Sequence, residues 1–251
     1  MKIKKRIIIL ITALNMFSFN IYAEKLVMGI YEELPPYSYK ENNQWIGIDI
    51  EIGNEIFRRI GIDAGYESYP PVRLIKTAKD GQIAGILATF CFGKEKSDLR
   101  DFLEYANVSA YTSKVSVFAL KERQIRISGL ADLKNRSVGV IRGYFYSSEF
   151  DRDKDMKKAE YDNDEQIVKI LAKGRIDAGV AESAPFLYFS AKSGLQDKFE
   201  EVYVLTENPV CMAFSKQYPG SESKIMADKV SRVIQQLKDE GFIEKILNKY
   251  K

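Results

Sequence analysis

Histidine is absent from this 251-residue chain, and cysteine occurs only twice. The absence of histidine excludes a histidine-dependent catalytic triad and argues against zinc or copper, for which imidazole is a leading ligand. The chain also lacks a glycine-rich phosphate loop, whose backbone amides usually bind the phosphates of a nucleotide. We therefore expect no cofactor and no bound metal.

The two cysteines, Cys91 and Cys211, leave the redox state open. An oxidising compartment would allow them to pair, and their spacing does not decide the matter. Because they fall in different parts of the fold derived below, we expect two buried unpaired thiols.

The first 23 residues have the layout of a secretory signal peptide. Four basic residues precede a mostly apolar stretch at residues 7–17, and Ala23 follows a short, more polar segment. The apolar stretch is too short for a membrane span, although an uncleaved anchor is the alternative. Because no cysteine directly follows Ala23, lipid attachment there is excluded, and we expect a free periplasmic protein cleaved near Ala23.

The net positive charge of the chain comes from that segment. Without residues 1–23, 34 lysines and arginines stand against 35 acidic residues, so the remainder is close to neutral. A nucleic-acid or anionic-membrane partner therefore has no electrostatic support.

Strand and helix patterns alternate after residue 24, which is typical of an α/β fold. The clearest helix has isoleucines at positions 48, 52, 56 and 60, with Asp49 as the expected cap and Gly61 as the stop. Residues 82–90, "QIAGILATF", form a strand pattern without polar alternation, which predicts a central strand covered by helices on both faces.

The pattern begins again near residue 129. It predicts a strand at 137–141, a helix from Asn163 or Asp164 to Gly174, a strand at 175–181, and a final helix pair separated by Gly241. The chain thus contains two α/β units.

Two similar stretches, "GQIAGILATF" and "GRIDAGVAES", end their strands at Thr89 and Glu182. Open α/β sheets bind ligands beyond the carboxyl ends of their strands, so these two residues are expected to face one cleft. The alternative is that helix, glycine and strand form a common sequence that says nothing about function.

Four further stretches carry a family resemblance: "LPPYSY", "GIDIEIGNEIFRRIG", "GRIDAGVAESAPFLYF" and "LKDEGFIEKILNKY". With the secretion signal, they resemble the family 3 extracellular solute-binding proteins, of the lysine/arginine/ornithine-binding type. The resemblance implies a two-lobed periplasmic-binding-protein-like fold of type II, each lobe a mostly parallel sheet flanked by helices.

The same resemblance implies lobe 1 at residues 24–113 and 216–251, lobe 2 at 114–215, and hinge crossings near 112–118 and 209–216. It further implies a monomer that closes on a small-molecule ligand and delivers it to an ABC permease.

An amino acid ligand needs an anion for its ammonium group and a cation or helix N-terminus for its carboxylate. Glu182 matches the family acid that holds the α-amino group, although the residue could equally be a helix N-cap, a role that Ser183 could also fill. Asp177 in the same stretch is expected to be structural.

For the carboxylate, Thr89 matches a family hydroxyl position, but the family arginine is displaced here. Lys96 occupies its place without a gap, whereas Arg100 does so only with a longer loop. We favour Arg100, because arginine can form two parallel bonds to a carboxylate, and Arg73 is a rival. Each of these cations could instead be a solvated surface charge.

The expected cleft is also aromatic. Tyr144 and Phe145 replace the small hydroxyl residues of the family, Tyr37 matches its stacking aromatic, and Tyr31 and Phe90 are further candidates. Such a cleft suits an apolar, aromatic or cationic ligand portion. The alternative is that some of these rings belong to the core.

The leading interpretation is a binding protein without catalysis that serves an importer of a polar amino acid or small amine. One alternative is an enzyme on the same scaffold, resembling cyclohexadienyl or arogenate dehydratases, with Glu182 or Glu33 as general acid. The other is a ligand sensor for a membrane signalling partner.

Overall fold

The computed structural model describes residues 25–32, 34–91 and 97–250. The expected signal peptide, Glu33 and Lys96 therefore lie outside the described residues. Within those ranges, no helix combines the length and the apolar character needed to cross a bilayer.

The first part of the chain alternates strands and helices, as its periodicity predicts, and adds a short hairpin that the periodicity does not predict. Its elements are β1 (Leu26–Tyr31), β2 (Tyr39–Glu41), β3 (Gln44–Ile46), α1 (Ile48–Ile60), β4 (Ala64–Tyr69), α2 (Pro71–Lys79), β5 (Gly85–Phe90), α3 (Ser97–Phe102) and β6 (Leu103–Tyr105). Strand β1 pairs in parallel with β4 and β5, while β2 and β3 form the hairpin. Strand β5 is buried along nearly its whole length, as its unbroken apolar run predicts.

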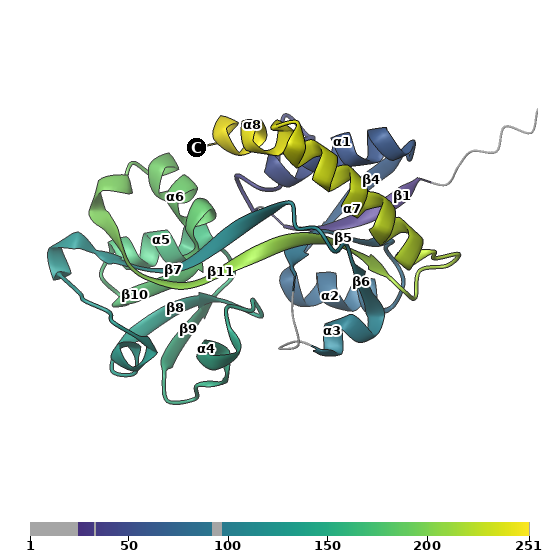
Figure 1. Cartoon of the computed structure of the whole chain (residues 1–251). Helices are drawn as coiled ribbons and strands as arrows, with labels where there is room; N and C mark the ends of the chain where they lie inside the picture. The colour runs from purple at the N-terminus through teal and green to yellow at the C-terminus, as the bar shows by residue number, and fades with distance from the viewer. Residues whose placement is uncertain (1–24, 33, 92–96, 251) are drawn as a thin grey trace, which may run out of the picture.

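Two long strands, β7 (Tyr111–Leu120) and β11 (Phe199–Ser215), cross the middle of the molecule (Figure 1). They are antiparallel to each other, and β11 also pairs with β5 near its carboxyl end. All the described strands except those of the β2-β3 hairpin thereby form one mixed sheet in the order β4-β1-β5-β11-β7-β10-β8-β9, with β6 paired to β11. The α/β fold class is confirmed, with one parallel strand set on each side of the long pair.

The second part of the chain builds the other parallel set. Its elements are η2 (Lys121–Arg123), η3 (Leu130–Leu133), β8 (Ser137–Ile141), α4 (Ser148–Arg152), β9 (Lys157–Tyr161), α5 (Asp164–Ala172), β10 (Ala178–Glu182), α6 (Ser183–Lys192) and η4 (Gln196–Lys198). Strand β8 pairs in parallel with β9 and β10. The side chain of Asn163 caps α5 by accepting a hydrogen bond from the Gln166 amide, so of the two predicted caps Asn163 is the one used.

The chain ends in two helices, α7 (Ser223–Asp239) and α8 (Phe242–Lys249), which the left-handed Gly241 separates as expected. Helix α7 contacts α1 and β11, and both terminal helices lie beside α1 in Figure 1. The guanidinium of Arg59 in α1 contacts the carboxylate of Glu240 at 2.5 Å. The carboxyl end of the chain therefore packs on the first strand set.

Helix α1 follows its isoleucine period and stops at Gly61, which has the left-handed conformation (φ 72°). The prediction that Asp49 caps this helix is wrong. The N-cap is Gly47, with φ 121°, and a β-carbon there would lie 2.2 Å from the Tyr37 carbonyl oxygen. Asp49 lies two residues after this N-cap, within the first turn of the helix, and is buried.

The expectation of two unpaired thiols is also wrong. Cys91 and Cys211 form a disulfide with a Cα–Cα distance of 5.2 Å. The two residues were assigned to different lobes, but β11 returns to pair with β5 and places Cys211 opposite Thr89. The Cys91 amide donates to the Pro209 carbonyl at 2.8 Å, which fixes the two chain segments beside each other.

Candidate ligand-binding site

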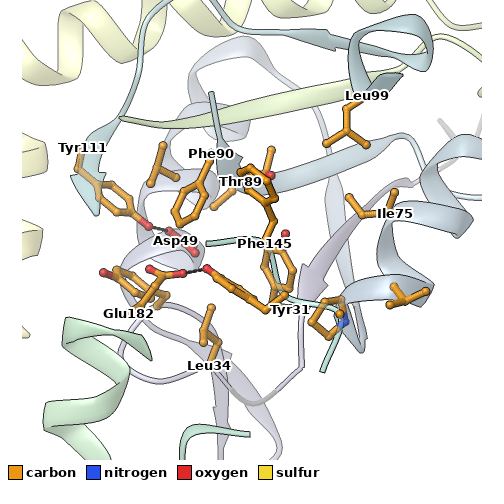
Figure 2. Close-up of a pocket in the computed structure, with 17 residues that line it drawn as sticks. Tyr31, Leu34, Asp49, Ile75, Thr89, Phe90, Leu99, Tyr111, Phe145 and Glu182 are labelled. Carbon is orange, nitrogen blue, oxygen red and sulfur yellow. Dashed lines mark hydrogen bonds between the residues drawn. The ribbon is translucent and has the colours of Figure 1, made fainter. Parts of the chain in front are cut away.

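A cavity of about 250 Å³ lies where the two strand sets approach each other (Figure 2). Its walls come from the carboxyl ends of β1, β5 and β10, the start of α2, and the turn before α4. The cavity brings together seven of the candidate residues named from the sequence: Tyr31, Tyr37, Thr89, Phe90, Tyr144, Phe145 and Glu182. The carboxyl ends of β5 and β10 therefore line the same cavity, as the sequence predicts for Thr89 and Glu182.

Glu182 is the acid at the end of β10 and is only 8% exposed. One carboxylate oxygen, Oε1, accepts a hydrogen bond from the Tyr144 hydroxyl, and the other, Oε2, accepts one from Ser113. Glu182 occupies the N-cap position of α6, but neither its side chain nor that of Ser183 forms a capping hydrogen bond to this helix. The Ser183 hydroxyl donates to Ser116 at 2.9 Å.

Tyr37 and Tyr111 form a stacked pair with ring centroids 5.6 Å apart. The Tyr37 hydroxyl lies 3.2 Å from the Ser113 hydroxyl, and Tyr111 donates to Oδ1 of Asp49 at 2.5 Å. Figure 2 shows the hydrogen bond between Tyr111 and Asp49 close to the hydrogen bond that Glu182 accepts. Two carboxyl groups, each with hydroxyl partners, therefore stand at the same cavity.

The buried position of these groups changes their acidity. Burial raises the pKa of Asp49 to about 7, with a small addition from the charge of Glu182, while the Tyr111 hydrogen bond opposes the rise. Burial also raises the pKa of Glu182, against the stabilising hydroxyls of Ser113, Tyr144 and Tyr37. The hydroxyls around Glu182 therefore favour its ionised form.

The tyrosine hydroxyls remain protonated donors at neutral pH. Burial raises the pKa of Tyr31 to about 12, with additions from Glu182 and Asp49, while the neighbouring Thr89 side chain opposes the rise. The pKa of Tyr144 is raised well above its ordinary value, chiefly by burial and then by the charge of Glu182.

The two described cations among the candidates lie outside the cavity lining. The Arg73 guanidinium lies 5.7 Å from the Tyr69 ring centroid, and that of Arg100 lies 5.0 Å from the Tyr105 ring centroid. Both side chains are exposed, because they lie on the outer faces of α2 and α3. Asp177 has the structural role expected of it, since it accepts bonds from Ser137 and pairs with Arg123.

Sequence reasoning missed three residues of this site: Asp49, Tyr111 and Ser113. Asp49 was assigned to a helix cap, although an acid flanked by Ile48 and Ile50 could have indicated a buried carboxyl. Tyr111 and Ser113 belong to the start of β7, where the sequence indicated only a crossing between lobes. In the part of the chain that the structure describes, no cluster of three or more acidic or cysteine side chains could hold a metal ion.

The chain is similar to several curated and solved proteins. It is 24% identical over 231 residues to the arginine-binding extracellular protein ArtP of Bacillus subtilis, a match that covers 90% of this chain and 86% of that protein. It is 27% identical over 177 residues to an L-arginine-binding protein of Pseudomonas aeruginosa, with 68% and 66% of the two chains covered.

The fold of a variant of the arginine-binding protein ArgBP from T. maritima matches with a TM-score of 0.74 at 20% identity, over 90% of this chain and 95% of that one. A histidine kinase sensor domain similar to periplasmic binding proteins matches with a TM-score of 0.76 at 18% identity, over 90% and 96%. The model of the bacterial extracellular solute-binding proteins, family 3, matches residues 26–251, so the chain belongs to that family.

Proposed function

We propose that this protein is a periplasmic receptor that captures a polar amino acid or a related small amine and delivers it to an ABC importer. The observation that carries the proposal is Glu182, a buried acid at the wall of a cavity between two strand sets. Its hydroxyl partners hold the carboxylate in place and stabilise its charge, so that it can accept an ammonium group.

The proposed lobes are residues 24–113 with 216–251, and residues 114–215. Under this division, Tyr31, Tyr37 and Phe90 line the cavity from one lobe, and Tyr144 and Glu182 line it from the other. A ligand that contacts both sets favours the closed arrangement, because closure is stabilised only by contacts that differ between the two states. Arginine-binding and histidine-binding relatives support a nitrogenous ligand.

The test is a thermal-shift screen of amino acids and amines, followed by calorimetry with Glu182→Gln. A true ligand raises the melting temperature, because it binds the folded form alone. The variant should lose at least about 30-fold in affinity, the equivalent of about 2 kcal/mol for one partner of a buried charged pair. Glu165→Gln, at an exposed position, is the matched control.

Two results would contradict the proposal. Turnover of prephenate or arogenate without any amine or amino acid ligand would favour the dehydratase-like enzyme. Unchanged ligand binding in Glu182→Gln would remove this carboxylate from the site.

A further inference from the structure

The charged side chains around the cavity have one sign. Asp49 and Glu182 both line it and are both at most 8% exposed. Among the described lining residues there is no lysine or arginine. A ligand carboxylate bound here would lose its hydration beside two acidic groups, which is costly unless a cation compensates for it.

Helix N-termini are the other common partners of a carboxylate, and three helices of eight or more residues begin at this cavity. At α1 the first turn already carries Asp49, and at α6 the N-cap residue is Glu182 itself. Helix α2 has Pro70 as its N-cap and Pro71 as its first residue, so two backbone donors are missing there. These three termini favour a ligand without negative charge.

The remaining walls are suited to a cation with an apolar body. The Tyr144 ring approaches both Tyr31 and Phe90, whose ring centroids each lie 6.1 Å from its own. The stacked rings of Tyr37 and Tyr111, which donates to Asp49, also line the cavity. Aromatic faces attract cations and cover hydrocarbon surface, whereas a carboxylate gains little from them.

We infer that the ligand is a small organic amine that carries no carboxylate. Its ammonium group is held by Glu182, at a cavity that Asp49 also lines, and its body packs on the tyrosine rings. This inference rests on the proposed function, because it names the ligand class of the same receptor. The cavity of about 250 Å³ lies just below the roughly 300–1,000 Å³ of pockets for drug-sized ligands, which agrees with a small amine.

Isothermal titration calorimetry at pH 7.5 with matched pairs tests the inference on the secreted chain. Each pair differs only by a carboxylate: tyramine and tyrosine, agmatine and arginine, cadaverine and lysine, histamine and histidine. For the pair that binds most tightly, the amine should have at least a tenfold lower dissociation constant than its amino acid.

Asp49→Asn supplies a variant of nearly unchanged shape. It should reduce the preference for the amine several-fold, because one of the two charges that oppose a carboxylate is gone. The exposed Asp228→Asn, in α7, is the control and should leave the preference unchanged.

Different results would contradict the inferred ligand class and the proposed receptor function. If the amino acid of the tightest pair binds as well as its amine or better, the inference is overturned while the receptor function stands. If Lys96→Gln then loses binding of that amino acid, Lys96 is the partner of the ligand carboxylate. If neither amines nor amino acids bind, the proposed function fails with the inference.

Discussion

The Tyr144 hydroxyl donates a hydrogen bond to Oε1 of Glu182, joining the turn before α4 to the end of β10. The same tyrosine ring approaches Tyr31 and Phe90 from the first strand set. Tyr144 therefore connects the acid of one strand set with the aromatic wall of the other. If Glu182 binds the ligand as proposed, a change at Tyr144 should alter both the acid and the contact between the two sets.

Tyr144→Phe should shift the pH dependence of ligand binding. The cation binds the ionised form of Glu182, so affinity is lost as the pH falls through the pKa of this acid. Because the Tyr144 hydroxyl opposes the rise of that pKa, its removal should move the acidic limb to higher pH. Calorimetry between pH 5 and 8 measures the shift, with Tyr39→Phe, which is not among the cavity residues, as control. Equal midpoints in the two variants would show that the hydroxyl does not stabilise the charge.

Gly143→Ala should weaken ligand binding by at least about fivefold, which corresponds to the lower end of the roughly 1–3 kcal/mol that an extra methyl group costs in an overpacked contact. A β-carbon at Gly143 would lie 2.3 Å from Cγ2 of Val72, which belongs to the first strand set, and its φ of 69° disfavours any side chain. Adding Val72→Ala should restore part of the affinity, because it removes the clash but not the backbone strain. Full affinity in the single variant would mean that the two strand sets need not approach this closely.

Replacement of both Cys91 and Cys211 by serine should lower the free energy of unfolding by about 2–5 kcal/mol. The disulfide closes a loop of 120 residues, for which the chain-entropy model gives a loss near the upper end of that range. Urea unfolding of the variant and of the native chain, with and without reductant, measures the effect. The prediction fails if reductant leaves the native unfolding curve unchanged.

Asp164→Asn should stabilise the protein above pH 8. Burial, with an addition from Glu182, raises the pKa of Asp164 to about 8, and one of its oxygens, Oδ1, has no hydrogen-bond partner among the residues that the structure describes. Below the unfolded pKa of about 4, this carboxyl is protonated in both states and does not lower the stability. As the pH rises from there through the folded pKa of about 8, the stability falls, because the unfolded state releases the proton more readily than the folded state. The asparagine variant should therefore gain at least about 1.4 kcal/mol at pH 9 relative to pH 5, since one pKa unit is worth that much. Parallel stability curves for the two proteins would contradict this.

The elements with strong local patterns could be predicted from the sequence. The isoleucine period and Gly61 define α1, and the apolar run before Thr89 defines β5. The acid at position 182 could be placed at the end of its strand, because parallel strands in α/β units present their carboxyl ends to the ligand.

Features that depend on pairing between distant segments could not be predicted in this way. The disulfide depends on the return of β11 to β5, and no local pattern encodes that register. Asp49 has the sequence context of a helix cap, and its hydroxyl partner, Tyr111, lies 62 residues further along the chain, beyond the reach of local patterns. The carboxylate partner expected at Arg73 or Arg100 depends on which helix face meets the cavity, a question of tertiary arrangement.

The most direct test of the central claim is a crystal structure with the tightest ligand found by calorimetry. The account predicts that the ligand's ammonium nitrogen lies within about 3.2 Å of a carboxylate oxygen of Glu182, the ordinary hydrogen-bond distance. A ligand bound elsewhere, or one whose ammonium group points away from Glu182, would contradict the account.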